Sequence, residues 1–205
     1  MQMIKNFIFD FGGVLIGYDY PSLVRTLFDD EVERRAFEEL VCSEEFMTRC
    51  DLGEESFAEI IRKQQELYPH WKRQLQEFHD RQLDAMTGEI PGMRDLLARL
   101  KAEGYHLYGL TNWSEAVYRV IEKFDILQMM EGTLISSEEK MLKPDAAIYH
   151  RLCEKFGLNP QECLFTDDKQ VNVDGARAAG MQAVLFTNAK ELAKITMPQP
   201  ARGMV

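Results

Sequence analysis

The stretch FIFDFGGVL, Phe7–Leu15, decides the fold. Its opening run of bulky apolar residues is typical of a strand buried on both faces of a parallel sheet. Asp10 follows at the carboxyl end of that strand, the edge at which open α/β sheets bind ligands. Gly12 and Gly13 then allow a tight loop whose backbone can approach a ligand closely. The alternative interpretation is a strand and a turn that merely contain an aspartate.

Composition limits the kinds of protein that this chain of 205 residues can be. Its length suits one domain, or one domain with an insertion, around a sizeable core. A formal charge of −10 argues against nucleic acid or an anionic membrane as a partner. No secretory signal or bilayer-length apolar run is visible, and the four cysteines lack a zinc spacing. We therefore expect a cytoplasmic protein with reduced thiols; the oligomeric state is not indicated.

A helical segment follows the glycine loop. Apolar residues recur at helical spacing over residues 22–86, as at Leu23 and Leu27, and Ser43 is placed to begin a helix. The segment shows no strand pattern. We expect a small helical cap domain, residues 18–86, inserted after the first strand.

Beyond residue 90 the pattern alternates between short apolar runs and helical stripes. The expected strands cover residues 105–110, 132–135, 163–166 and 183–186. Short connections between strand and helix imply right-handed crossovers and a parallel sheet with helices on both faces. The expected fold class is therefore α/β, with a Rossmann-like doubly wound core. This core comprises residues 1–17 and 87–197, and a tail, residues 198–205, follows it.

Polar residues gather at the carboxyl ends of these strands. They are Asp10, Thr111, Asn112, Asp167 and Asp168, and Lys143 precedes a helix in the same series. In a parallel sheet such positions meet at one edge. Three carboxylates brought together repel one another, and a shared hard cation such as Mg²⁺ holds them ionised.

This arrangement suits phosphoryl transfer to an aspartate. A carboxylate can attack phosphorus to give an aspartyl phosphate, which divides hydrolysis into two displacements. The lysine and the threonine hydroxyl would hold phosphoryl oxygens, and the asparagine amide would add a hydrogen bond. Each residue also has an ordinary structural interpretation. Asp167 or Asp168 could cap the next helix, Thr111 and Asn112 could cap the helix that begins near Trp113, and Lys143 could be a solvated loop lysine.

These motifs resemble those of the haloacid dehalogenase (HAD)-like hydrolase superfamily, and the resemblance covers nearly the full length. The matching segments, in order, are residues 9–15 (FDFGGVL), 110–112 (LTN), 143–144 (KP) and 165–168 (FTDD) with Asn172. The resemblance implies a Rossmann-like core and a helical cap that closes over the site.

The resemblance also implies a role for each site residue. Asp10 would be the nucleophile, and Mg²⁺ would be held by Asp10, the Gly12 carbonyl, and Asp168 with Asp167. Thr111 and Lys143 would act on the phosphoryl group. Residues Asn112, Gly12 and Gly13 complete the expected substrate-binding set.

One position departs from the family pattern. Most phosphatases of this superfamily carry a second aspartate two residues after the nucleophile, as general acid and base, and here that residue is Gly12. Glycine there resembles the branch of glucose-1-phosphatase-like proteins. Asp19, at the start of the cap, is a candidate substitute; the alternative is a solvated aspartate before Pro21.

The leading hypothesis is a Mg²⁺-dependent phosphatase of a small phosphorylated metabolite, with a sugar phosphate favoured. A 2-haloacid dehalogenase is one alternative, although the Asp167–Asp168 pair favours the metal-dependent branch. A catalytically weak homologue that binds a phosphorylated ligand or a protein is another. Candidate cap residues for specificity are Tyr18, Tyr20, Arg25, Phe46 and Arg49.

Overall fold

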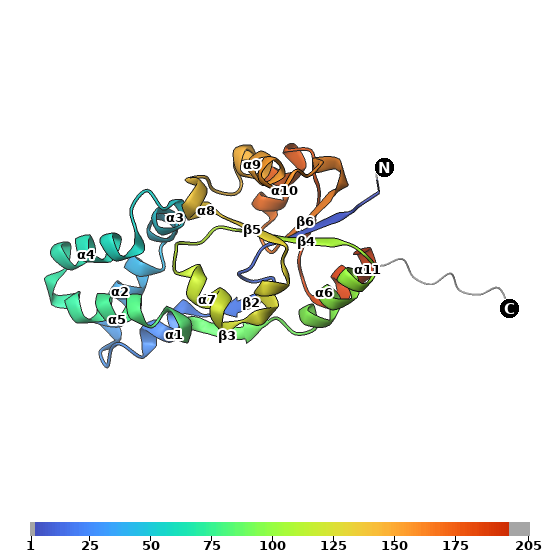
Figure 1. Cartoon of the computed structure of the whole chain (residues 1–205). Helices are drawn as coiled ribbons and strands as arrows, with labels where there is room; N and C mark the ends of the chain where they lie inside the picture. Colours follow the sequence, from blue (N-terminus) through green and yellow to red (C-terminus); the bar gives the residue numbers. More distant parts are fainter. Residues whose placement is uncertain (1–2, 197–205) are drawn as a thin grey trace.

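Five parallel strands form the central sheet in a computed structural model that describes residues 3–196 (Figure 1). In spatial order they are β5 (Gly132–Ile135), β4 (His106–Thr111), β1 (Asn6–Phe9), β6 (Cys163–Asp167) and β7 (Gln182–Leu185). The first strand lies in the middle, with Phe7 opposite both Leu107 and Leu164. Its four residues are all buried, which agrees with the apolar run in the sequence.

Helices cover both faces of this sheet (Figure 1). They are α6 (Met93–Ala102), α7 (Val117–Lys123), α9 (Ala146–Phe156), α10 (Gln170–Ala178) and α11 (Ala189–Thr196), while the short helix α8 (Ser136–Glu139) directly follows β5 at the edge of the sheet. Because side chains alternate along a strand, Phe7 and Phe9 pack in one cluster with α6, α7 and α11. Ile8 packs in the other cluster, with α9 and α10. The predicted doubly wound core is confirmed.

Five helices form the insertion that follows the first strands, as predicted. They are α1 (Tyr20–Arg25), α2 (Glu31–Val41), α3 (Glu44–Leu52), α4 (Phe57–Leu67) and α5 (Lys72–Asp80). Aromatic rings fill its interior; the ring of Phe37 lies 5.5 Å from that of Trp71 and 6.1 Å from that of Phe78. Ser43 begins α3, because its hydroxyl accepts a hydrogen bond from Phe46 N. Short 3₁₀ turns occur at Pro69–Trp71, Gln82–Ala85, Asp125–Met129 and Pro160–Glu162.

A two-stranded antiparallel sheet was missed by the sequence analysis. It pairs β2 (Ile16–Tyr18) with β3 (Met86–Glu89) where the chain leaves and re-enters the core. The expectation of an insertion without strands up to residue 86 is therefore wrong at its end. Strands of three and four residues that contain Gly17 and Gly88 are too short to show an alternating pattern.

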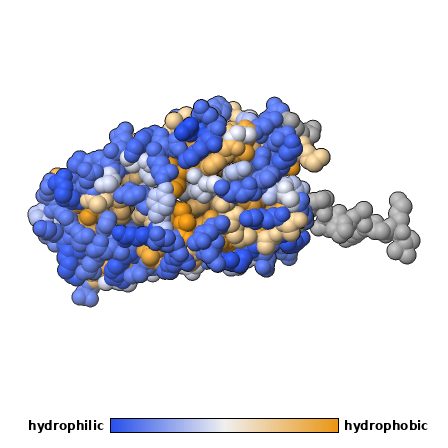
Figure 2. All heavy atoms as spheres, viewed as in Figure 1, coloured by the Kyte–Doolittle hydropathy of each residue, from blue (hydrophilic) through white to orange (hydrophobic). Residues whose placement is uncertain are grey.

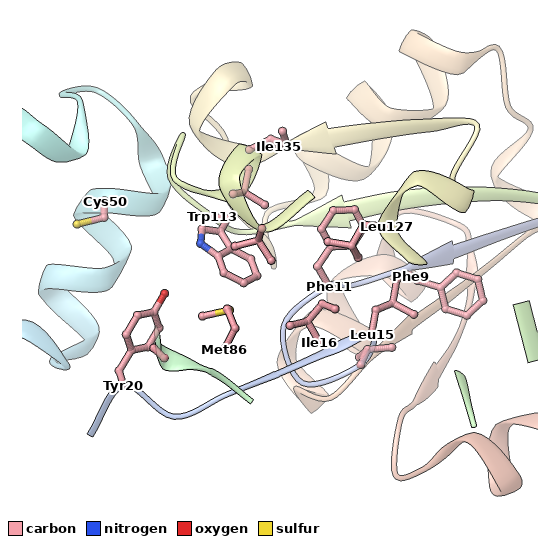
Figure 3. Packing of buried hydrophobic residues seen from close by; sticks show 14 of the residues in the cluster. Phe9, Phe11, Leu15, Ile16, Tyr20, Cys50, Met86, Trp113, Leu127 and Ile135 are labelled. Atoms are coloured by element: carbon pink, nitrogen blue, oxygen red, sulfur yellow. The ribbon is translucent and has the colours of Figure 1, made fainter. Parts of the chain in front are cut away.

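This small sheet supports the division of the chain that we propose. We assign residues 1–17 and 87–197 to the core and residues 18–86 to the cap; of these, residues 1, 2 and 197 lie outside the described residues. The apolar interior continues across the junction, since Phe11, Ile16, Met86 and Trp113 belong to one cluster (Figure 3). The expected tail, residues 198–205, lies outside the described residues. Within residues 3–196, no helix combines the length and the apolar character needed to span a bilayer.

The end of α3 docks directly on the core. The Ser136 hydroxyl donates to the backbone carbonyl of Asp51 at 2.6 Å. Gly53 ends the helix with φ of 66°, in the left-handed region that favours glycine. A Cβ atom at Gly53 would lie 2.4 Å from the carbonyl oxygen of Ser137. The close approach of cap to core therefore depends on a glycine at this position.

We predict that Gly53→Ala destabilises the protein more than Gly157→Ala. Both glycines end a helix with φ of 66°, but a Cβ at Gly157 would meet nothing within 4 Å. Gly157→Ala should lower the free energy of unfolding by about 1 kcal/mol, through backbone strain alone. Gly53→Ala should cost a further ~1–3 kcal/mol, because backbone atoms of Ser137 must move. Urea unfolding measures both; equal losses would contradict the tight docking.

Candidate active site

The three predicted carboxylates meet at one edge of the sheet. Asp10 directly follows β1, Asp167 ends β6, and Asp168 comes next. One oxygen from each lies within 4.8 Å of the others. Thr111, the last residue of β4, and Lys143 line the same cleft as Asp10. The parallel topology thus brings together residues that are up to 158 positions apart in the sequence, counted from Asp10 to Asp168.

Lys143 lies at the centre of this cluster. Its side chain is 1% exposed, and its ammonium lies 3.0 Å from Asp10 Oδ1 and 2.7 Å from Asp167 Oδ2. It also donates to the backbone carbonyl of Leu110 at 3.0 Å. Burial lowers the pKa of Lys143, but the two carboxylates outweigh burial and the pKa is raised overall. The lysine is therefore a fixed positive charge beside Asp10.

Asn112 holds the backbone of Lys143. Its amide nitrogen donates to the Lys143 carbonyl at 3.0 Å, and its amide oxygen accepts from the Lys143 N–H at 2.9 Å. The predicted substrate contact from Asn112 stays a prediction. In this structure both ends of its amide bond the backbone of Lys143, so Asn112 positions the lysine.

Asp167 and Asp168 occupy different environments. Asp167 is completely buried and accepts hydrogen bonds from Lys143, from the Lys169 N–H at 2.8 Å and from the Asn172 amide. Asp168 is exposed and lines the cleft. Burial raises the pKa of Asp168, and the negative charge of Asp167 adds to this effect. Asp168 is therefore the carboxylate with room for a cation, a hard oxygen ligand of the kind that Mg²⁺ prefers.

The glycine loop fits tightly between these groups. Gly13 has φ of 76°, and a Cβ atom there would lie 2.4 Å from Asp168 Oδ2. A Cβ atom at Gly12 would lie 3.0 Å from the ring of Tyr18. A side chain at residue 12, where the family pattern carries an aspartate, would therefore require the Tyr18 ring to shift.

Thr111 offers a free hydroxyl to the cleft. Thr111 is 1% exposed, and its Oγ1 has no hydrogen-bond partner among residues 3–196. An unsatisfied buried hydroxyl costs free energy unless a ligand or water completes its bonding. Together with the Lys143 ammonium, it provides donors for an anion placed against Asp10.

Asp10 has an unusual protonation equilibrium. Burial raises its pKa to about 6, the charge of Asp167 adds to the shift, and the charge of Lys143 opposes it. One oxygen also accepts a hydrogen bond from the Phe11 N–H at 2.7 Å. Asp10 is therefore ionised at neutral pH, although less readily than an exposed aspartate.

Asp19 lines the cleft but is already engaged. One of its oxygens accepts from the Ser22 N–H at 2.8 Å as the N-cap of α1, and the other lies 3.4 Å from the Arg25 guanidinium. The sequence analysis offered a solvated aspartate as the alternative for this residue, and helix capping is a structural role that it did not name. Its predicted role as proton donor stays a prediction.

The cleft between core and cap has a volume of about 960 Å³. Its cap side includes Tyr18, Tyr20, Glu44, Met47, Thr48 and Asp51. Figure 2 shows a largely hydrophilic surface over the cap and a gathering of hydrophobic residues near the middle of the face. Of the expected cap residues, the two tyrosines line the cleft. Phe46 is buried within the cap, and Arg49 pairs with Glu55.

The sequence analysis missed the cleft residues of α3. Glu44, Met47, Thr48 and Asp51 are spaced by three, one and three positions, so they share one face of the helix. Phe46 and Cys50 are buried on another face. The sequence pattern that could have revealed them is this helix face of mixed polar and apolar residues, which differs from the apolar stripe. The same pattern is equally typical of a solvated helix surface.

Comparisons with known proteins identify the family. A profile of the haloacid dehalogenase-like hydrolases matches residues 4–180. The chain belongs to this family. It is 33% identical to flavin mononucleotide hydrolase 1 of Arabidopsis thaliana over 106 residues, 51% of this chain and 43% of the relative. It is 34% identical to a phosphoglycolate phosphatase of Mannheimia succiniciproducens over 98 residues, 47% of this chain and 44% of the relative. These matches thus span less than half the length of either relative.

A solved structure shares the fold over the whole length. A HAD family enzyme of Bacteroides thetaiotaomicron has a TM-score of 0.76 at 22% identity, covering 96% of this chain and 100% of that one. Another structure of that enzyme contains magnesium and inorganic phosphate, with a TM-score of 0.71 at 24% identity, covering 90% and 95%. The likeness confirms the fold of this HAD-like hydrolase, including the helical insertion.

We predict that the effect of Asp10→Asn on the stability of the metal-free protein becomes more favourable as pH increases. Because the folded-state pKa of Asp10 is raised to about 6, the wild type loses stability as Asp10 ionises between its ordinary pKa and that value. Asparagine does not ionise. The difference in unfolding free energy, measured with urea and EDTA, should grow by about 1 kcal/mol from about pH 5 to about pH 7.5. A constant or shrinking difference would refute the raised pKa.

Proposed function

We propose that this HAD-like hydrolase is a Mg²⁺-dependent phosphatase that acts on a small phosphorylated metabolite through an aspartyl phosphate on Asp10. The observation that carries this proposal is the buried Lys143 ammonium, 3.0 Å from Asp10 Oδ1 and beside the unpartnered Thr111 hydroxyl. That arrangement provides a nucleophile and two phosphate donors in one place. Phosphatase names among the relatives, and the neighbour solved with magnesium and phosphate, support it.

Each residue of the site has its own role in the proposed reaction. An oxygen of the Asp10 carboxylate attacks phosphorus, and the bond from phosphorus to the leaving oxygen breaks. Lys143 offsets the negative charge of the transferred group, and Thr111 donates a hydrogen bond to one of its oxygens. Asp167 and Asn112 keep the lysine in place.

A magnesium ion fits the donor set at this site. Asp10, Asp168 and the Gly12 carbonyl are the proposed ligands, with Asp167 as the acidic neighbour that faces Lys143. The ion would supply charge neutralisation for the phosphoryl group. Gly13 is the next residue of the loop that carries two of these proposed ligands, Asp10 and the Gly12 carbonyl.

The charge of the cleft favours an uncharged alcohol, such as a sugar, as the leaving group. Among the described residues that line the cleft, the cap contributes the carboxylates Asp19, Glu44 and Asp51 but no cation. The cations are Lys143, which is paired with carboxylates, and Lys169 from the core. A second anionic group on the substrate would therefore lie near like charges. We propose a sugar phosphate, as in the glucose-1-phosphatase-like branch.

We predict that the purified protein hydrolyses an aryl phosphate only with Mg²⁺. Asp10→Asn should lower kcat by at least about 10³-fold, because no aspartyl phosphate can form. Asp174→Asn is the control, since this aspartate is exposed on α10 and does not line the cleft. Phosphate release with Mg²⁺ or EDTA measures both variants. Equal activity in wild type and Asp10→Asn would refute the proposed function.

We also predict a preference that depends on substrate charge. The value of kcat/KM for glucose 1-phosphate should exceed that for phosphoglycolate by at least about tenfold, because the phosphoglycolate carboxylate meets the acidic cap wall. Glu44→Gln removes one negative charge from this wall and should therefore reduce the ratio of the two kcat/KM values. Steady-state kinetics on both substrates provide the measurement. A preference for phosphoglycolate would contradict the proposed substrate class.

A further inference from the structure

Proton transfer to the leaving group needs a donor that the nucleophile loop does not carry. At residue 12 a side chain would meet the Tyr18 ring at 3.0 Å and the Trp113 ring at 3.7 Å. The loop therefore carries no acid at residue 12 and packs there against two aromatic rings. A donor must come from elsewhere in the cleft wall.

Six described carboxyl groups line the cleft: Asp10, Asp19, Glu44, Asp51, Asp145 and Asp168. The first and last belong to the nucleophile and metal set. Asp19 caps α1, and Asp145 caps α9 by accepting from the Ala147 N–H at 2.9 Å. Glu44 is the exposed first residue of α3. Glu44 and Asp51 are therefore the two carboxyl groups without an assigned task, and Asp51 is the more buried of them, partly buried where Glu44 is exposed.

The core holds Asp51 in a defined position. Its backbone carbonyl accepts from the Ser136 hydroxyl at 2.6 Å, and its carboxyl group accepts a hydrogen bond from the Ser114 backbone. Ser114 lies three residues after Thr111, in the loop that leaves β4 at the active edge. Gly53, two residues further along, fits against Ser137. These contacts with the core hold Asp51 at a fixed position in the wall of the cleft.

The surroundings of Asp51 suit proton transfer. Burial raises its pKa to about 7, while the charge of Lys169 opposes the shift, Asp10 adds to it and Lys143 opposes it. Tyr18 and Tyr20 are its neighbours on the cap side, and their own pKa values are raised in part by its charge. Both protonation states of Asp51 are then populated near neutral pH, which a group that gives and takes a proton requires.

We propose that Asp51 of the cap is the proton donor and acceptor of the phosphatase reaction, in place of the residue missing at Gly12. The proposal rests on the proposed function. When Asp10 attacks phosphorus and the bond to the leaving oxygen breaks, the Asp51 carboxyl gives its proton to that oxygen. The Asp51 carboxylate then takes a proton from water as the water oxygen attacks phosphorus. The bond between Asp10 and phosphorus breaks, which releases phosphate and restores both residues.

The leaving group provides the test. Nitrophenolate departs without a proton, whereas a sugar alkoxide needs one. In Asp51→Asn, kcat for glucose 1-phosphate should fall by about 10²- to 10⁴-fold. With nitrophenyl phosphate, rapid mixing should still show a fast burst of nitrophenolate, at a rate within about threefold of the first turnover of the wild type. Steady-state turnover after the burst should be slow, because the aspartyl phosphate lacks its general base.

Two further variants make the result specific. Asp30→Asn replaces another aspartate of the cap, the N-cap of α2, which lies outside the cleft, and it should leave the ratio of the activities on the two substrates unchanged. Asp51→Ala with added formate should regain part of the activity on glucose 1-phosphate. This rescue tests the carboxyl group even where Asp51→Asn folds poorly.

The outcomes separate the two proposals. A wild type without Mg²⁺-dependent activity on either substrate removes the proposed function and the Asp51 role with it. An active wild type in which Asp51→Asn loses the burst and the sugar phosphate activity equally, without formate rescue of Asp51→Ala, overturns the Asp51 role alone. The same holds if Asp19→Asn shows the leaving-group signature and Asp51→Asn does not.

Discussion

The buried ion pair of Lys143 with Asp10 and Asp167 is the constraint on which the structure of the site depends. An ammonium group removed from water costs several kcal/mol unless carboxylates and hydrogen-bond acceptors surround it. Here the acceptors come from the ends of three adjacent strands, β1, β4 and β6. The sheet order that places β1 between β4 and β6 is therefore also the order that makes this charge tolerable.

The cluster is supported by residues that do not face the cleft's centre. Asn112 binds the backbone of Lys143 from both ends of its amide, and Asn172 donates to Asp167. The Lys143 ammonium itself is held by the Leu110 carbonyl, by Asp167 and by Asp10. Phosphoryl chemistry depends on such a preorganised charge, because the protein then needs no rearrangement when negative charge moves onto the transferred group.

The sequence predicted the core of this site but not its cap wall. The sequence placed four residues together because each lies at the carboxyl end of an apolar strand, and the carboxyl ends of parallel strands meet at one edge of the sheet: Asp10, Thr111, Asp167 and Asp168. Strands β2 and β3 left no such signal, since each is short and contains a glycine. Asp51 could not be singled out either. Its helix face is polar like any solvated surface, and only the docking contact with Ser136 places it toward the core.

Glycine at residue 12 changes how closure relates to chemistry. An acid on the nucleophile loop would stand beside Asp10 whether or not the cap were docked. Here that residue is a glycine beside the Tyr18 ring, and the carboxyl group that we propose in its place belongs to α3. That helix contacts the core at Ser136 and Ser137. Proton transfer from α3 would then require the docked state, which would also shield the proposed aspartyl phosphate from bulk water.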